Sequence, residues 1–241
     1  MTTRYKIGIF GDSYSTDFSL SFDQNIDTTK AGTAWVNLLK KDYDIENFSF
    51  PGSALYYSYY KFLKNYKEFD KIIFVFTLPG RISLKHPYDK KFMHLSYHHG
   101  IDLKKIMYPE DSKKYQIISD YMKYVQDLEK ENILYNLMKE DIFSKRSDII
   151  SIYTEDLMTI TAKENAYWGI DFEHQLTVND IRHCHLIKEN NFILYNKVKE
   201  CLEKNIEFKL DIDDYVTCEN QEDYLLPHKT HVAKVMKNWK I

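Results

Sequence analysis

Residues able to perform covalent chemistry occur in two short segments that lie far apart in the chain. Ser13 follows a Gly-Asp pair directly after an apolar run, while Asp180, His183 and His185 lie together in the last third of the sequence. A serine hydroxyl becomes a good nucleophile only when a neighbouring base takes its proton and a third group orients that base. The sequence therefore contains the residue types of a nucleophile, a base and an orienting carboxylate.

The elements that position these residues are predicted from apolar periodicity. Short apolar runs that stop at a turn residue predict buried strands, and apolar residues repeating every three to four positions predict helices. The predicted strands are 5–10, 45–50, 71–77 and 148–154, with a short further strand at 208–212, and the predicted helices are 34–41, 53–69, 113–143 and 187–202. Strands that alternate with helices and are apolar on both faces predict an α/β fold with helices on both sides of the sheet.

Three predicted turns fall at the carboxyl ends of these strands, where α/β proteins carry their functional sites. They are residues 11–13, 51–53 and 77–80. The chain has only 7 glycines in 241 residues, so a glycine at each of these turns is informative. Tight turning alone explains any one of them. The equivalent position of all three favours a common site.

These segments resemble a known family. Residues 9–15, Ile-Phe-Gly-Asp-Ser-Tyr-Ser, resemble the first sequence block of the SGNH (GDSL-type) serine hydrolases. Residues 47–53 are similar to the second block, and residues 180–195 to the last block, an Asp and a His followed by a terminal helix. The resemblance implies a flavodoxin-like three-layer α/β/α fold with a mostly parallel sheet of four to five strands. It also implies metal-independent ester hydrolysis through an acyl-serine intermediate.

The resemblance also implies a role for each matching residue. Ser13 is the expected nucleophile, and its backbone N–H is expected to hold the oxyanion together with that of Gly52. Asp180 is the expected orienting carboxylate. His185 is the expected base, because a polar pair, Asn190 and Asn191, follows it at the family's spacing. His183, which fits the family's Asp-x-x-His spacing, is the alternative.

The segment of this chain that corresponds to the third family block departs from the family pattern. It normally reads Gly-x-Asn-Asp, and its Asn side chain completes the oxyanion hole, whereas residues 77–81 here read Thr-Leu-Pro-Gly-Arg. Losing one oxyanion donor costs on the order of 100- to 1000-fold in rate. Either Thr77 or Arg81 takes the place of the Asn in oxyanion or substrate binding, or the chain is a weak or inactive member that binds a glycan or a protein partner.

The leading hypothesis is a serine esterase acting on a small acyl ester, without metal or other cofactor. An insertion at about residues 81–112 is rich in charged and aromatic residues, which favours a polar ester such as a carbohydrate O-acetyl group over a long lipid chain. The insertion contains His94 and His98, whose spacing would place them on one helix face, but no further ligand set accompanies them. We expect one α/β domain over residues 1–204 and a C-terminal extension, 205–241, packed on it.

Composition narrows the possible partners and cellular location of the protein. A net charge of −3 with interleaved acidic and basic residues gives no footprint for nucleic acid, and no apolar run is long enough to span a membrane. The first residues lack a signal-peptide pattern. The three cysteines are odd in number and lack metal spacing, which indicates a reducing compartment such as the cytoplasm. Few glycines and many Lys, Ile, Asn and Tyr residues suggest an AT-biased genome, viral or bacterial.

Overall fold

A four-stranded parallel sheet forms the centre of the molecule. The computed structural model describes residues 5–16, 33–79, 81–85, 92–95, 112–164, 178–180, 186–217 and 225–227. The strand order is β2-β1-β3-β6, with β1 (Lys6–Phe10), β2 (Asp44–Asn47), β3 (Lys71–Phe76) and β6 (Ile150–Tyr153). Every neighbouring pair in this sheet is parallel. The predicted α/β fold is confirmed.

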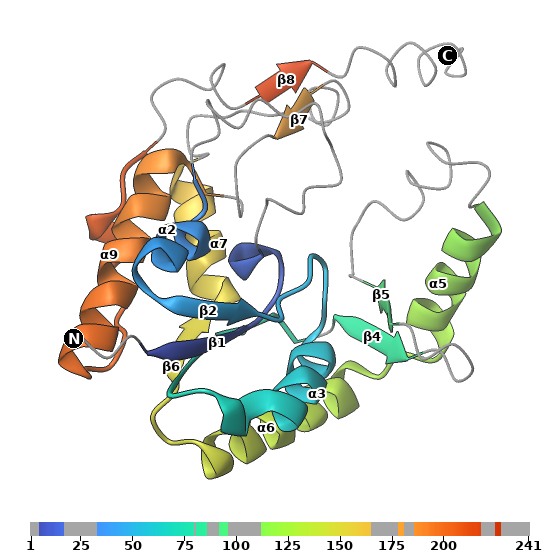
Figure 1. Cartoon of the computed structure of the whole chain (residues 1–241). Coiled ribbons are helices and arrows are strands. Elements are labelled where there is room, and N and C mark those ends of the chain that lie inside the picture. The colour runs from blue at the N-terminus through green and yellow to red at the C-terminus, as the bar shows by residue number, and fades with distance from the viewer. Residues whose placement is uncertain are drawn as a thin grey trace.

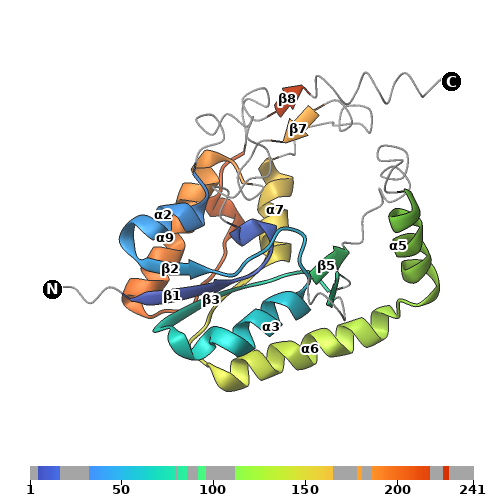
Figure 2. The same ribbon diagram turned by 45° about the vertical axis from the view of Figure 1, so that its right-hand side comes forward.

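Helices cover both faces of this sheet and complete a three-layer arrangement (Figures 1 and 2). On one face lie α2 (Trp35–Asp42), α7 (Thr154–Glu164) and α9 (Lys188–Lys204). On the other lie α3 (Leu55–Asn65), which ends in a 3-10 turn η3 (Tyr66–Glu68), and α6 (Leu128–Lys145).

The sequence of β3 explains why both faces are buried. Successive side chains of a strand point to opposite faces. Ile73 and Val75 contribute to the core shared with α2, α7 and α9, whereas Phe74 and Phe76 face α3 and α6. The second core is largely aromatic: the rings of Phe74 and Phe76 stack with centroids 4.5 Å apart. Strand β3 is therefore held from both sides, which fixes the position of the loop that follows it.

The insertion contains regular structure that the sequence analysis did not predict. Strands β4 (Ile82–Lys85) and β5 (Phe92–Leu95) form an antiparallel pair. The alternation of Ile82 and Leu84 with polar residues is the period-two signal of such a strand. His94 lies in β5, so the helical spacing considered for His94 and His98 is wrong at His94, and His98 lies outside the described residues.

Two other predicted elements differ from the structure. The single helix predicted at 113–143 is two helices, α5 (Ser112–Tyr124) and α6, because the Asp127 side chain accepts hydrogen bonds from the N–H groups of Glu129 and Lys130 and thereby starts a new helix. The strand predicted at 208–212 is absent: the chain after α9 has no regular structure until the 3-10 turn η6 (Ile212–Asp214).

A second antiparallel pair links two distant parts of the chain. Strand β7 (Val178–Asp180) pairs with β8 (Leu225–Pro227), with Asp180 opposite Leu225. The sequence analysis predicted neither strand. The pairing joins the segment just before the two candidate base histidines to the C-terminal extension.

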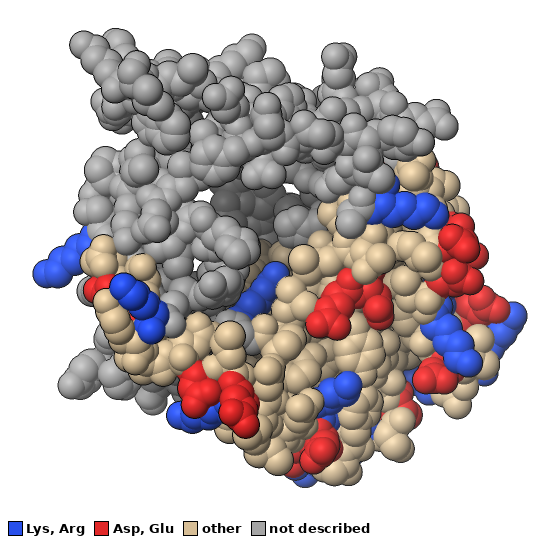
Figure 3. All heavy atoms as spheres, turned by 180° about the vertical axis from the view of Figure 1, so that it is seen from behind, with Lys and Arg blue, Asp and Glu red and all other residues tan. Residues whose placement is uncertain are grey.

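In the view from behind, the described residues carry acidic and basic side chains side by side, with no large area of one sign among them (Figure 3). Among the helices of the described residues, none has both the length and the apolar content that crossing a membrane requires.

Candidate functional site

Ser13 is the one half-buried residue in an otherwise buried loop. It begins the 3-10 turn η1 (Ser13–Ser15) that follows β1, and Asp12 caps this turn by accepting a 3.0 Å hydrogen bond from the Tyr14 N–H. Every residue from 10 to 16 is buried except Ser13, which is half-buried. The loop therefore holds its backbone inside the protein and leaves the Ser13 position accessible from outside.

The Asp12 carboxylate ties the carboxyl ends of three strands together. Its side chain is fully buried. Oδ2 accepts hydrogen bonds from Thr77 Oγ1 at 2.8 Å, Arg81 Nη1 at 2.8 Å and Thr154 Oγ1 at 3.1 Å. Thr77 and Arg81 follow β3, while Thr154 follows β6. A buried carboxylate needs such partners, because burying an unpaired charge is costly, and here the partners fix the Ser13 loop to the neighbouring strands.

Thr77 and Arg81 differ in how many hydrogen-bond donors remain after their bonds to Asp12. A threonine hydroxyl has one proton, and that of Thr77 goes to Asp12 while its oxygen accepts from Arg81 Nη1 at 3.1 Å. A guanidinium has five N–H donors. Only Nη1 of Arg81 has partners among the described residues, and the Arg81 side chain is 14% exposed. Among the described residues, Arg81 therefore has N–H groups that are not engaged, whereas the single proton of Thr77 is engaged.

The second loop packs onto the carbonyl group of Gly11. This oxygen accepts hydrogen bonds from the Phe50 N–H at 3.2 Å and from the hydroxyls of Ser53 and Ser58, both at 3.1 Å. A Cβ atom at Gly11 would lie 2.3 Å from Ser15 Oγ, so only glycine fits at this position. The loop after β2 is thereby held against the Ser13 loop.

Gly52 supplies a candidate oxyanion donor in this second loop. It has a φ of 72°, and the Ser53 N–H closes the turn onto the Phe50 carbonyl at 3.1 Å. Proline before a glycine with positive φ is the pattern of a type II turn. Within the described residues the Gly52 N–H has no acceptor, which leaves it able to bind an oxygen atom of a ligand.

The remaining predicted site residues are only partly placed. Asp180 lies in β7, where the backbone is described. His183 and His185 lie outside the described residues. The chain is described again from Leu186, which is fully buried in the same core cluster as Tyr14.

A chain of hydrogen bonds connects the residue after Ser13 to the residue after His185. Trp35 Nε1 donates to the Tyr14 carbonyl at 2.7 Å, and the Trp35 N–H donates to Asn191 Oδ1 at 3.0 Å. Asn191 Nδ2 in turn donates to the Leu186 carbonyl at 2.9 Å. These bonds are buried, so they constrain the start of the segment that leads back to His185 relative to the Ser13 loop.

The buried carboxylate of Glu164 provides a second anchor for this segment. Its Oε1 accepts the Ile187 N–H at 3.1 Å and Asn190 Nδ2 at 2.7 Å. Asn190 also exchanges two hydrogen bonds with the backbone of Val216. The polar pair at the start of α9 therefore helps to position residues 186 and 187, which precede the helix.

Sequence reasoning missed Thr154, Trp35 and Glu164. A signal existed for Thr154, because it stands at the carboxyl end of a predicted strand, like the other site residues. Trp35 belongs to the apolar pattern of the predicted helix 34–41. No sequence pattern marks the hydrogen bonds of Trp35 or Glu164, because their partners are distant in the sequence.

Comparison with models of protein families, with curated proteins and with solved structures finds no match to this chain.

Proposed function

We propose that this protein is a serine esterase that hydrolyses a small acyl ester, with a carbohydrate O-acetyl group as the favoured substrate. The observation that carries the proposal is the accessibility of Ser13 in a loop that is otherwise buried and hydrogen-bonded to three neighbouring strand ends. A partly exposed serine in a loop that is hydrogen-bonded to its neighbours, at the carboxyl edge of a parallel sheet, suits nucleophilic catalysis.

In the proposed reaction, Ser13 Oγ attacks the ester carbonyl carbon and its proton passes to His185, or to His183 as the alternative. Asp180 orients the imidazole. The carbonyl oxygen becomes an oxyanion that the Ser13 and Gly52 N–H groups bind. The imidazolium then protonates the departing alcohol, and a water molecule, deprotonated by the same histidine, releases the acid and restores Ser13.

Arg81 is the better of the two proposed replacements for the missing Asn, because the Thr77 proton is engaged by Asp12. A guanidinium donor near a developing oxyanion would stabilise it by charge as well as by hydrogen bonding.

A non-catalytic role in binding a glycan or a protein partner is the second candidate. It is favoured by the same network, since both Thr77 and Arg81 are bound to Asp12. With both side chains held by Asp12, the site would lack a side-chain donor for the oxyanion.

We propose the cytoplasm as the compartment of this activity. The three cysteines are odd in number, and Cys201 is a free, buried thiol, as expected of a protein in a reducing environment.

Hydrolysis of p-nitrophenyl acetate and of an acetylated oligosaccharide tests the proposal. We expect Ser13→Ala to lower kcat/KM at least 100-fold, because the nucleophile is lost. Ser15→Ala is the matched control: it removes a buried serine hydroxyl of the same turn and should leave most of the activity. His183→Ala and His185→Ala, measured separately, identify the base. Activity that is equal in the wild type and Ser13→Ala would contradict the proposal.

A further inference from the structure

Helix α6 exposes more large apolar side chains than any other element within the described residues. Four of them lie in its first ten residues, at Leu128, Ile133, Leu134 and Leu137. Leu134 is 42% exposed and Leu137 is 55% exposed. Single apolar residues are normal on a protein surface, but a group of them on one element marks an interaction site.

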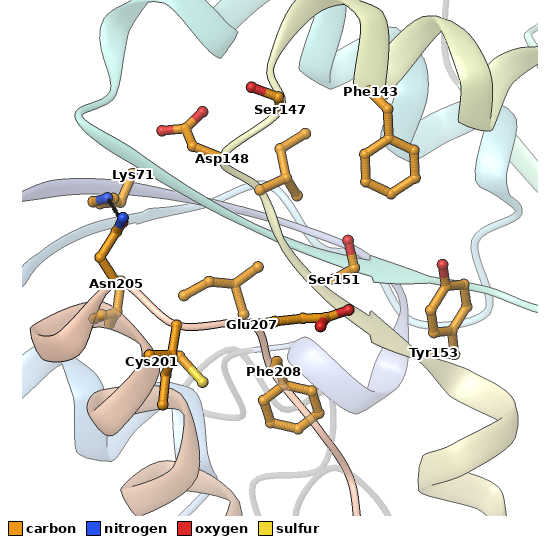
Figure 4. Close-up of a pocket in the computed structure, with 14 residues that line it drawn as sticks. Lys71, Phe143, Ser147, Asp148, Ser151, Tyr153, Cys201, Asn205, Glu207 and Phe208 are labelled. Carbon is orange, nitrogen blue, oxygen red and sulfur yellow. Dashed lines mark hydrogen bonds between the residues drawn. The ribbon is translucent and has the colours of Figure 1, made fainter.

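The opposite side of α6 is already occupied by the core of the protein. Ile142 is buried, and Met138 packs against the same aromatic cluster. Figure 4 shows Phe143 at a cavity of about 550 Å³ beside β6, and its ring stacks on that of Phe76 at 5.6 Å. Leu137 lies about 140° around the helix from Ile142. It therefore points away from the sheet, and α6 runs along the outside of the molecule in Figures 1 and 2.

Four residues line one stripe on this outer side, with spacings of four, three and four positions: Lys130, Leu134, Leu137 and Asp141. This is the spacing with which one helix meets another. Two leucines occupy the middle of the stripe, a cation one end and an anion the other. A reversed second copy would place Leu134 opposite Leu137 and Lys130 opposite Asp141. The stripe is therefore complementary to itself, which a contact between two identical surfaces requires.

The charges at the two ends of the stripe can pair between copies. Lys130 has no ion pair within the part of the chain that the structure describes. Asp141 accepts hydrogen bonds from Tyr59 and Lys145, both at 2.9 Å, but a carboxylate has about four lone-pair sites and can accept another. The same reversal brings Asp127 within one position of Lys145 of the second copy. Exposed ion pairs add little affinity, so the leucines supply the affinity and the charges select the orientation.

We propose that α6 binds the α6 of a second copy of this chain in antiparallel orientation, with Leu134 of each copy against Leu137 of the other and Lys130 against Asp141. The stripe is about 16 Å long, so the contact is smaller than that of most stable dimers. The dimer is therefore weak and reversible. The proposal does not depend on the esterase activity.

Sedimentation equilibrium of the full-length protein, from micromolar to millimolar concentration, tests this proposal. We expect the average mass to rise from that of one chain toward that of two. Leu137→Asp should weaken the association about 30-fold or more, because burial of this leucine is lost twice in each dimer. The matched control is Met158→Asp, which makes the same change at an exposed residue of α7, on the other face of the sheet. This variant should associate like the wild type.

Charge reversal tests the orientation of the two helices. Lys130→Glu places two carboxylates opposite each other at both ends of the contact and should weaken the association about tenfold. Asp141→Lys should do the same with two cations. An equimolar mixture of the two variants should associate like the wild type, because every contact between the unlike chains then joins an anion to a cation. Urea unfolding of each variant checks that it is folded, since Asp141→Lys also removes the bond to Tyr59.

Three results would overturn the proposal. Wild-type protein that stays monomeric up to millimolar concentration would show that α6 does not bind a second copy. Association that Leu137→Asp leaves unchanged would place the contact on another surface. A mixture of Lys130→Glu and Asp141→Lys that associates no better than either variant alone would exclude the antiparallel pairing.

Discussion

The buried ion pair between Asp12 and Arg81 makes a quantitative prediction. Replacing Arg81 by methionine keeps much of the apolar stem and removes the only cation that the described residues place on the Asp12 carboxylate. We expect this change to destabilise the whole protein, because the Asp12 carboxylate joins the ends of β1, β3 and β6.

The structure sets the size of the effect. The Asp12 side chain is fully buried, and the Arg81 nitrogen lies 2.8 Å from its oxygen. Removing one partner of a buried pair costs roughly 3–5 kcal/mol. Because Tyr14 N, Thr77 Oγ1 and Thr154 Oγ1 still donate to the carboxylate, we place Arg81→Met at the lower end, about 3 kcal/mol. For a chain of this length that corresponds to a fall in Tm of about 6–12 °C.

Urea unfolding of the wild type, Arg81→Met, Asp12→Asn and the double variant measures this effect. The double variant removes the unpaired charge, so its loss should be smaller than the sum of the single losses by about 1–2 kcal/mol. If Arg81→Met changes the free energy of unfolding by less than about 1 kcal/mol, the pair behaves like a surface ion pair, and the role assigned to Asp12 is wrong.

Three further predictions concern residues outside this pair. Asn191→Ala removes buried hydrogen bonds to Trp35 and Leu186, so it should lower the free energy of unfolding in urea by about 2–3 kcal/mol. A loss under about 0.5 kcal/mol would mean that these bonds do not hold the segment. Burial, with Glu203 nearby, raises the pKa of Tyr43 from 10.0 to about 12. The stability that this tyrosine contributes is therefore retained below pH 10.0 and lost as pH rises through about 12. Tyr43→Phe should flatten this alkaline decline in the free energy of unfolding measured in urea, and an unchanged slope would contradict the assignment. Burial also raises the pKa of the Cys201 thiol. Cys201→Ser should therefore leave the number of thiols that react with Ellman's reagent unchanged in the native protein and lower that number in urea. A fall under native conditions would show that the thiol is accessible.

The sheet could be predicted from the sequence because its strands are apolar on both faces. The run 71–77 has the composition of an interior parallel strand, and the structure places β3 between β1 and β6. The turns that follow the strands were equally predictable, since strand direction alone brings their carboxyl ends to one edge of the sheet.

The contacts that join these turns were not predictable in the same way. Thr154 lies 142 residues from Asp12, and Asn191 lies 156 residues from Trp35. Apolar periodicity reports which face of an element is buried, but it carries no information about which distant polar group completes a hydrogen bond. The break before α6 had a local signal, the Asp127 cap, which the continuous apolar pattern obscured.

Reaction with a fluorophosphonate probe, followed by intact-mass analysis, tests the central claim most directly. An activated serine attacks the phosphorus and displaces fluoride, and the adduct stays on the protein. The account predicts a single adduct on the wild type and on Ser15→Ala, and none on Ser13→Ala. Folded wild-type protein that forms no adduct, or an adduct that persists in Ser13→Ala, would contradict the assignment of Ser13 as the nucleophile.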